Sequence, residues 1–196
     1  ALAYGGYPSG GGVSAATEQY NGSTWSVQSA MITAREQLGG NPSATDGALA
    51  IGGYHATPTC NLTEEYIQNI ICTGTYKCNL PSTAAWSTGG TLINAMYYNS
   101  GAGNQDDAAS IGGYNGAYRA CHEQYDGTAW SSKTAAPYST GGAFSAGTTT
   151  NAFIFGGGAS GTNSTNVVEW DGTSMAAVAA MTVQRTWSGG NGTPSA

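Results

Sequence analysis

The sequence predicts an all-β protein, one domain long, that repeats one structural unit four times. Three observations carry this prediction. Glycine is abundant, at 31 of 196 residues, whereas charged residues make up only 8%, and coiled coils or helical bundles need Ala, Glu, Lys and Leu in quantity. An apolar segment ending in Gly-Gly occurs four times. An acidic residue beside an aromatic one follows each of these segments.

Each unit opens with the apolar segment. The four segments are Ala1 to Gly6, Ala48 to Gly53, Ala108 to Gly113 and Ala152 to Gly157. Their second glycines lie at 6, 53, 113 and 157, so successive units are 47, 60 and 44 residues apart. Periods of this length indicate a repeat architecture. The 12 Tyr, 5 Trp and 3 Phe supply enough apolar bulk for a core, and we therefore expect the chain to fold.

The middle of each unit predicts a β-hairpin. Asn21-Gly22, Asp126-Gly127 and Asp171-Gly172 follow the acidic-aromatic signal in three units, and such dipeptides favour type I′ turns between two strands. The second unit lacks this turn. Trp25 and Trp130 follow the turns, and we expect both to be buried between neighbouring units.

A second glycine pair closes each unit. These pairs are Gly39-Gly40, Gly89-Gly90, Gly141-Gly142 and Gly189-Gly190. Each unit then holds four short strands, and four strands in about 40 to 45 residues are typical of a propeller blade. The prediction is a four-bladed all-β propeller with four-stranded antiparallel blades, in which residues 1–196 form a single domain.

The repeats resemble kelch repeats, whose pattern is an apolar segment, Gly-Gly, a later Tyr and then a Trp. The first and third units match best, through Gly5-Gly6, Tyr20 and Trp25 and through Gly112-Gly113, Tyr125 and Trp130. The fourth unit has Trp170 and Met175 at the aromatic positions, and the second lacks the Trp. The amino-acid sequence of the repeats is also similar to that of kelch-like arrays in structural proteins of marine and environmental bacteriophages.

The two termini are in complementary phase. Residues 185–196 resemble residues 35–47, which precede the second Gly-Gly strand. We expect the last strand to complete the first blade and close the ring. The same phase fits a segment of a longer kelch-like array, and this alternative stays open.

Charge and hydropathy narrow the partners. The net charge is −6, and the five basic residues are scattered, which excludes a cationic stripe for nucleic acid. They are Arg35, Lys77, Arg119, Lys133 and Arg185. No apolar run approaches the roughly 18 to 20 residues that span a bilayer, so membrane insertion is not expected.

The acidic residues predict a scaffold role. Glu18, Glu64, Glu123 and Glu169 recur once per unit, and we expect them to pair with Arg or backbone donors between blades, because positions that recur in every repeat maintain the scaffold. Adjacent strand residues such as Glu64 and Glu65 point to opposite faces and cannot act on one bond together.

No catalytic, cofactor-binding or metal-binding residue is predicted. The two histidines, His55 and His122, lie in no nucleophile motif. Galactose oxidase shares the kelch fold, but its Tyr and His copper ligands have no counterpart here, so an enzyme of that kind is disfavoured. Asp106-Asp107 lacks the ligand spacing of a calcium loop and is interpreted as a solvated turn.

The even count of four cysteines, together with few charges and many Ser, Thr and Gly residues, fits an exposed, oxidising setting. Among three possible disulfide connectivities we favour Cys60 with Cys121 and Cys72 with Cys78, although sequence alone does not decide between them. Sequons begin at Asn21, Asn61, Asn163 and Asn191.

These features favour a non-enzymatic structural or adhesive module of a virion or extracellular surface assembly. Its expected partners are other subunits of that assembly, and glycans. The alternative is a secreted carbohydrate-binding lectin, because aromatic side chains stack on sugar rings. Recognition is expected on the irregular segments 55–80 and 94–107, where the repeat is disrupted. The candidate binding surface comprises Tyr54, His55, Tyr97, Tyr98, Asp106, Asp107 and Tyr114.

Overall fold

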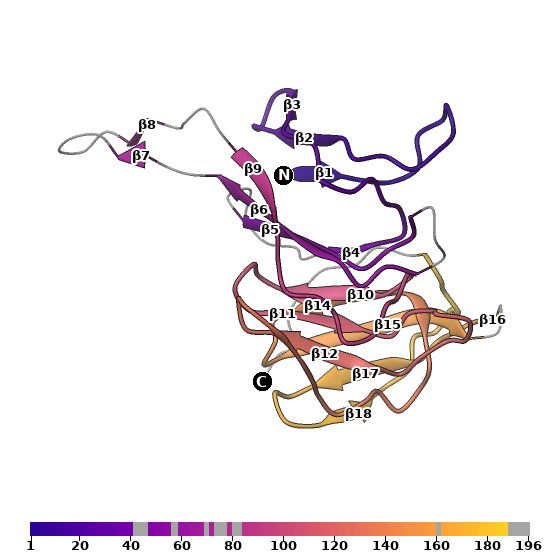
Figure 1. The fold of residues 1–196 in the computed structure, drawn as a ribbon. Coiled ribbons are helices and arrows are strands. Elements are labelled where there is room, and N and C mark those ends of the chain that lie inside the picture. The colour runs from indigo at the N-terminus through magenta and orange to yellow at the C-terminus, as the bar shows by residue number, and fades with distance from the viewer. Residues whose placement is uncertain are drawn as a thin grey trace.

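The protein, in a computed structural model, is built from short antiparallel strands. The structure describes residues 1–40, 47–55, 59–68, 71–72, 78–79, 84–159 and 162–187, and within these ranges it contains no α-helix. Four sheets follow one another in chain order from indigo to yellow (Figure 1). The expected all-β class is confirmed.

Each sheet runs up and down in sequence order. The first contains β1 (Leu2–Tyr4), β2 (Thr17–Tyr20) and β3 (Trp25–Gln28). The second contains β4 (Gly39–Gly40), β5 (Gly47–Ile51), β6 (Thr63–Gln68) and β9 (Ala84–Thr88). The third contains β10 (Ser100–Gly103), β11 (Ala108–Ile111), β12 (His122–Tyr125) and β13 (Trp130–Ser132). The fourth contains β14 (Gly141–Gly147), β15 (Ala152–Ala159), β17 (Val167–Trp170) and β18 (Met175–Ala177), with β16 (Thr162–Asn163) beside β15.

A separate ribbon of β7 (Ile71–Cys72) and β8 (Cys78–Asn79) interrupts the second sheet between β6 and β9. It occupies the place where the second repeat lacks its Asn-Gly or Asp-Gly turn. The predicted departure of this unit from the repeat is therefore confirmed.

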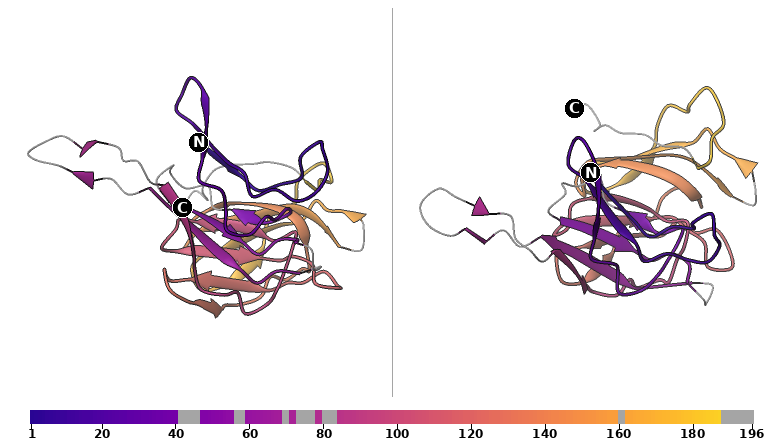
Figure 2. Two further views of the ribbon diagram at one scale, coloured as in Figure 1. Left: turned by 45° about the horizontal axis from the view of Figure 1, so that its top comes forward. Right: turned by 90° about the horizontal axis from the view of Figure 1, so that it is seen from above.

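The first strands of neighbouring sheets lie side by side. β10 lies beside both β4 and β14, and the turned views show the same succession of sheets (Figure 2). A Cβ on Gly101 would collide with the backbone of Gly40. Gly40 and Gly101, which lack side chains, therefore permit this close approach of β4 and β10.

The hairpins form as expected, but their turns are not type I′. Gly22 has φ +106°, whereas Asn21 does not have positive φ, and a type I′ turn requires positive φ at both central residues. Instead, Asn21 Oδ1 accepts hydrogen bonds from the N–H groups of Ser23 and Thr24, at 2.9 and 3.0 Å. Asp126 and Asp171 close the third and fourth hairpins in the same way.

The hydrophobic core consists of layers between consecutive sheets. One layer, between the first and second sheets, includes Ala50, Tyr66 and Trp86. A second includes Leu49 and Tyr125 between the second and third sheets. The third layer lies between the third and fourth sheets and contains Ala102, Ala109, Ile111, Ala152, Ile154, Val168 and Trp170. Each sheet thus depends on its neighbours for burial.

The tryptophan predictions were half right. Trp130 is buried, and its Nε1 donates to Thr63 Oγ1 of the preceding sheet at 2.9 Å. Trp25, at the same hairpin position, is exposed. The second unit does have a counterpart, Trp86, which pairs with Tyr66 and donates to Thr17 Oγ1 at 2.9 Å. The β7–β8 insertion had separated Trp86 from its signal in the sequence.

Ring closure by residues 185–196 falls mostly outside the described residues, which end at 187. Arg185 bridges to Ser164, a residue just before β17 of the fourth sheet. The first sheet has three strands among the described residues. No helix within the described ranges is long and apolar enough to cross a membrane.

Candidate functional site

The candidate site lies where the connectors meet. We call connectors the segments that follow the last strand of each sheet: residues 29–38, 89–99, 133–140 and 178–187. The first three lead to the first strand of the next sheet. Tyr98 N donates to Gln37 O at 2.9 Å, Gly142 N donates to Tyr98 O at 2.9 Å, and Trp187 N donates to Gly142 O at 3.0 Å. This chain of backbone hydrogen bonds joins three connectors and the start of β14.

The backbone turns sharply at the same place in three connectors. Gln37, Tyr98 and Trp187 have φ of 55°, 62° and 56°, a left-handed conformation that non-glycine residues seldom adopt. Such strain persists only where the surrounding structure enforces it, and it concentrates at functional sites. Here the hydrogen bonds between connectors hold it.

Tyrosine side chains gather at this end of the sheets. Tyr54 and Tyr114 directly follow the Gly-Gly pairs of β5 and β11, and Tyr97 forms a β-bridge with Tyr114. The Tyr97 ring lies 5.7 Å from that of Tyr54, 4.6 Å from that of Tyr98 and 5.3 Å from that of Tyr114, measured between centroids. The Tyr114 ring in turn lies 5.1 Å from that of Tyr118.

Four of these rings, all except that of Tyr54, border a cavity of about 660 Å³, which we call the tyrosine hollow. Its lining residues are Tyr97, Tyr98, Tyr114, Gly116, Ala117, Tyr118 and Ser139. The volume lies within the usual range for small-molecule sites, about 300 to 1,000 Å³. The lining tyrosines are partly exposed, so their rings remain accessible to a ligand.

The phenols of Tyr97 and Tyr98 are neutral hydrogen-bonding groups. Burial raises the pKa of Tyr97 above its ordinary value, and the neighbouring Tyr114, Tyr98, Tyr118 and Tyr54 raise it further. Burial likewise raises the pKa of Tyr98, followed by the effects of Tyr118 and Glu36. Both hydroxyls therefore keep their protons at neutral pH and can donate as well as accept hydrogen bonds.

Charged side chains do not form the described lining of the hollow. The cation nearest in sequence, Arg119, donates from Nε to Asn115 Oδ1 at 2.7 Å. The hollow thus offers aromatic faces, phenol hydroxyls and the Ser139 hydroxyl. This combination suits a neutral ligand that has both apolar C–H faces and hydroxyl groups.

The structure divides the predicted binding surface into two parts. Tyr54, Tyr97, Tyr98 and Tyr114 come together at the hollow. His55 follows Tyr54, and its Nδ1 lies 2.8 Å from Ala34 O, so this ring is anchored to a connector.

Asp106 and Asp107 lie at the other end of the third sheet. They belong to the turn between β10 and β11, whereas Tyr98 precedes β10 and Tyr114 follows β11. Asn104 Oδ1 accepts the N–H groups of Asp106 and Asp107, and Asp107 Oδ2 accepts a hydrogen bond from Thr149 Oγ1. Both aspartates are exposed, as expected for a solvated turn.

Sequence reasoning missed two aromatic residues. Tyr118 lines the hollow, and the Trp187 ring lies 4.5 Å from the Tyr98 ring while remaining 62% exposed. A signal for Trp187 was present, because it stands at the same connector position as Tyr98. Tyr118 carried no repeat signal, because the residues at its position in the other repeats are Val13, Thr59 and Asn163.

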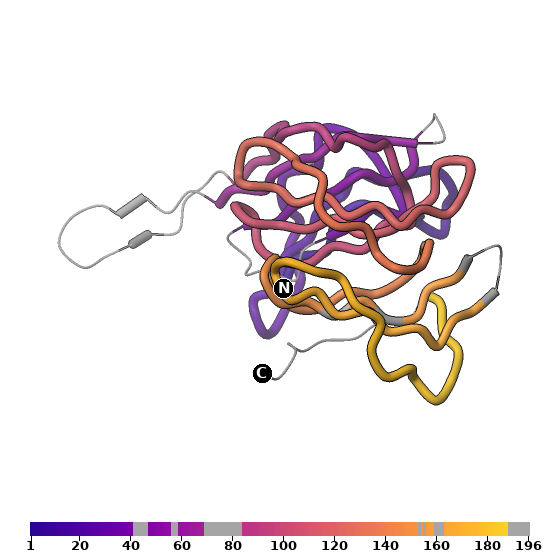
Figure 3. The backbone as a smooth tube through the Cα atoms, turned by 90° about the horizontal axis from the view of Figure 1, so that it is seen from below, coloured from indigo at the N-terminus to yellow at the C-terminus, as the bar shows by residue number. Residues whose placement is uncertain are grey.

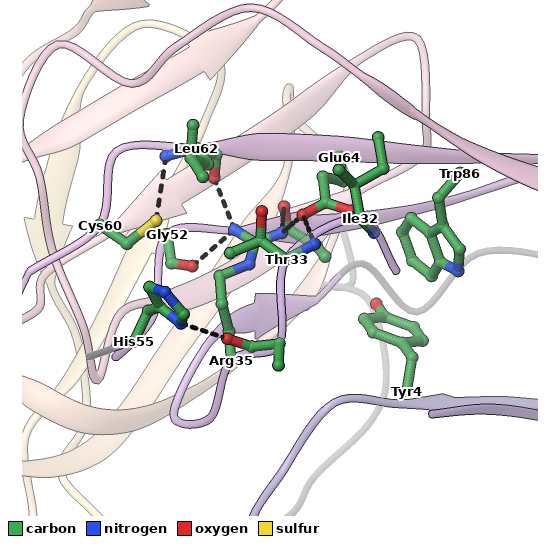
Figure 4. A network of polar contacts seen from close by, with 12 residues as sticks. Tyr4, Ile32, Thr33, Arg35, Gly52, His55, Cys60, Leu62, Glu64 and Trp86 are labelled. Atoms are coloured by element: carbon green, nitrogen blue, oxygen red, sulfur yellow. Dashed lines mark hydrogen bonds and ion pairs between the residues drawn. The ribbon is translucent and has the colours of Figure 1, made fainter. Parts of the chain in front are cut away.

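The recurring carboxylates act between sheets, as expected, at two junctions. Glu64 accepts the N–H groups of Ile32 and Thr33, at 2.7 and 3.0 Å, and pairs with Arg35 Nη2 at 3.0 Å (Figure 4). Both charged side chains are buried. Arg35 Nη1 also donates to the carbonyls of Gly52 and Leu62, at 2.8 and 2.9 Å.

Glu123 repeats this arrangement at the next junction. It accepts the N–H groups of Ile93 and Asn94, at 2.9 and 3.0 Å, and the Asn94 Nδ2 group at 2.7 Å. Met96 N donates to Cys60 O, as Arg35 N donates to Ser14 O. Met96 therefore occupies the Arg35 position, and the Asn94 amide supplies the additional donor.

The equivalence assigned to Glu169 was wrong by one residue. Strand pairing aligns Tyr20, Tyr66, Tyr125 and Trp170, which lie opposite Trp25, Trp86, Trp130 and Met175. Val168, not Glu169, therefore corresponds to Glu18, Glu64 and Glu123. Because successive strand residues face opposite sides, Glu169 points away from the junction that Val168 faces.

The junction between the third and fourth sheets has lost both partners of the contact. Val168 replaces the carboxylate. Ala136 N donates to Ala120 O as Leu92 N donates to Asn61 O, so the next residue, Pro137, is the counterpart of Ile32 and Ile93. Proline has no N–H to donate. A cavity of about 160 Å³ lies here, lined in part by Val168, Ala136 and Thr140.

The predicted Cys60–Cys121 disulfide is wrong, because both are free thiols. Their positions are not equivalent: Cys60 O accepts the Met96 N–H, and its counterpart, Arg119 O, accepts the Thr140 N–H. Cys121 lies two residues beyond Arg119. Cys72 and Cys78 face each other across the β7–β8 pair, but their side chains lie outside the described part of the structure.

Within the described ranges, no three His, Cys, Asp or Glu side chains are grouped so as to hold a metal ion. No protein-family model matches the chain, and no curated protein sequence is similar to it. The fold is similar to that of YjhT, a kelch-type β-propeller, with a TM-score of 0.67 at 14% sequence identity. This likeness covers 92% of the present chain and 63% of YjhT, and it concerns the fold alone.

Proposed function

We propose that this protein is a non-enzymatic, kelch-like β-propeller module that binds carbohydrate at the tyrosine hollow. The four sheets are its blades. The observation that carries the proposal is the cluster of tyrosine rings around a cavity of about 660 Å³ with no charged residue in its described lining.

The chemistry of the hollow favours a sugar over other small molecules. A pyranose presents axial C–H groups that pack against an aromatic ring and hydroxyls that exchange hydrogen bonds with phenols and serine. Tyr97, Tyr98 and Ser139 supply both kinds of contact in one place. An anionic or cationic ligand would need charged partners to offset its desolvation, so a neutral glycan fits best.

The surrounding assembly follows from the repeat resemblance. We place the module on a virion or extracellular surface, where other subunits carry it and the hollow provides adhesion. Exposed apolar residues support contacts with such subunits: Ile32, Ile93 and Val183, each in a different connector, are 61%, 55% and 55% exposed. A role of this kind requires binding and no catalysis.

A printed glycan array and a titration test the proposal. The wild-type protein should bind one class of neutral oligosaccharide, and titration with that sugar should show about tenfold weaker binding for Tyr97→Ala and for Tyr98→Ala, since each removes a stacking surface. Tyr7→Ala is the matched control, because Tyr7 is 64% exposed and lies outside the hollow. No glycan bound by the wild type, or equal binding by all variants, would contradict the proposal.

A further inference from the structure

The junction between the first and second sheets combines an arginine, two backbone N–H groups and a carboxylate. The fourth connector carries the same donors and the first sheet carries the same carboxylate, and neither set has a partner among the described residues. At the first junction, the connector supplies Arg35 and two N–H groups, and the following sheet supplies Glu64. The same positions can be assigned in every repeat from hydrogen bonds that all four repeats share.

The fourth connector is a close copy of the first. Met181 N donates to Thr165 O as Met31 N donates to Ala15 O, and Arg185 N donates to Ser164 O as Arg35 N donates to Ser14 O. Arg185 is therefore the counterpart of Arg35, and the N–H groups of Thr182 and Val183 are the counterparts of those that Glu64 accepts. Arginine stands at this position in the first and fourth connectors only, whereas Met96 occupies it in the second and Thr140 in the third.

The first sheet carries the complementary set. Glu18 corresponds to Glu64 by strand register, and Gly5 and Ala16 correspond to Gly52 and Leu62, because Gly5 N donates to Ala16 O as Gly52 N donates to Leu62 O. An arginine docked on the face with Glu18 would thus contact one carboxylate and two carbonyl oxygens. Glu18 is exposed and has no side-chain partner among the described residues.

The aromatic residues of the first sheet are uncovered on the same face. Trp25 is 52% exposed and Val27 is 81% exposed, whereas Trp86 and Trp130 at the Trp25 position are buried against the preceding sheet. Trp130 Nε1 also donates to Gly90 O at 3.0 Å. The fourth sheet offers the equivalent carbonyl at Ala179, since Val178 N donates to Val167 O as Gly89 N donates to Thr63 O.

Both halves of this unfilled junction are exposed in a single chain. Arg185 is exposed and has no ion-pair partner in the described part of the chain. Residues 178–187 are the last part of the yellow tube and lie at the edge of the molecule (Figure 3). No hydrogen bond among the described residues joins the first sheet to the fourth.

We propose that the fourth connector of one chain docks on the first sheet of a second copy, with Arg185 paired to Glu18 of that copy. Head-to-tail contacts of this kind are heterologous and generate rings or filaments. The occupant is a second copy because its fourth connector carries the residues that reproduce the Arg35–Glu64 junction, while no hydrogen bond among the described residues joins the chain's own fourth connector to its own first sheet.

Charge reversal with mixing tests the pairing. The association is measured by sedimentation velocity at physiological ionic strength, which screens the repulsion between chains of net charge −6. The apparent mass of the wild-type protein should rise above the single-chain mass of 19.8 kDa as its concentration increases. Glu18→Arg and Arg185→Glu should each weaken self-association about tenfold or more. An equimolar mixture of the two variants should associate again, because every contact then unites opposite charges.

Two exposed charge reversals serve as controls, Asp106→Arg and Lys133→Glu, and neither should change the association. Wild-type protein that stays at the single-chain mass up to near-millimolar concentration overturns the proposal. So does self-association that the Glu18 and Arg185 variants leave unchanged. If the protein is monomeric and each single reversal lowers Tm at every concentration while both together in one chain restore it, the pair closes within one chain and the second copy is wrong.

Discussion

Trp25 and Trp130 occupy the same position in their sheets, yet Trp25 is 52% exposed and Trp130 is 7% exposed. The difference lies in what covers them. Trp130 packs between the third and second sheets and donates to Thr63 and Gly90, whereas the face of Trp25 has no sheet in front of it among the described residues. Position in a repeat therefore does not determine burial; the neighbour does.

This pair predicts unequal stability effects. Trp130→Ala should lower the free energy of unfolding by about 3 to 5 kcal/mol, the usual cost of truncating a large buried aromatic. Trp25→Ala, measured at low protein concentration, should cost about 1 kcal/mol or less. Urea unfolding of both variants beside the wild type checks this, and equal losses would show that Trp25 is covered.

Breaking the Arg35–Glu64 pair should lower the free energy of unfolding, and a second substitution that copies the Glu123 junction should restore part of it. Arg35→Met leaves Glu64 buried without its cation and should cost about 3 to 5 kcal/mol. Adding Thr33→Asn reproduces the junction of Glu123, where an Asn side chain supplies the extra donor, and should recover about 1 kcal/mol. Chemical denaturation of the single and double variants measures both steps. A double variant no more stable than Arg35→Met would refute the equivalence of the two junctions.

His122 predicts a loss of stability in mild acid. Burial lowers the pKa of its imidazole to about 4, and its Nε2 has no hydrogen-bond partner among the described residues. In the unfolded chain the imidazole binds a proton near pH 6.5. The free energy of unfolding therefore falls by up to about 3 kcal/mol as the pH falls from about 6.5 to about 4.

Comparing Tm of wild type and His122→Phe across this range isolates that contribution, because the carboxylates titrate equally in both proteins. The variant should be less sensitive to pH between about 6.5 and 4. Parallel curves for the two proteins would show that His122 does not titrate as the structure implies.

Gly112, which belongs to a Gly-Gly pair, and Gly116, which does not, predict a difference between two alanine substitutions. Gly112 has φ +66°, and a Cβ there would lie 2.6 Å from Thr140 O, whereas Gly116 has φ +102° and open space around it. Both substitutions carry backbone strain of about 1 to 2 kcal/mol, and only Gly112→Ala adds a clash. Thermal unfolding should therefore place Gly112→Ala clearly below Gly116→Ala, and the reverse order would be inconsistent with the close approach.

The repeat made the sheets predictable from sequence, and the insertions hid the rest. Glycine pairs and acidic-aromatic signals located most strands, because each repeat must build the same sheet. Trp86 was missed since the β7–β8 ribbon separates it from Tyr66. Glu169 was misaligned because it is the nearest acidic residue to Trp170, although Val168 stands two residues before the aromatic residue, as the other three carboxylates do.

The candidate site was predictable in part. Tyr54, Tyr97, Tyr98 and Tyr114 stood out because they follow strand-ending glycines or interrupt the repeat. Their convergence depends on hydrogen bonds between connectors far apart in sequence, such as that from Tyr98 N to Gln37 O. No local pattern reports such contacts, which is why Asp106 and Asp107 were grouped with the tyrosines although they lie at the opposite end of the third sheet.

The tyrosine hollow is formed by connectors and by loops after β11, while the sheets meet through Glu64, Glu123 and the buried tryptophans. The residues that could determine ligand choice are therefore separate from those that maintain the fold. Mutation can alter the hollow without altering the sheets. Such a scaffold is suited to diversification, in which related proteins exchange a few side chains at one end of a constant framework.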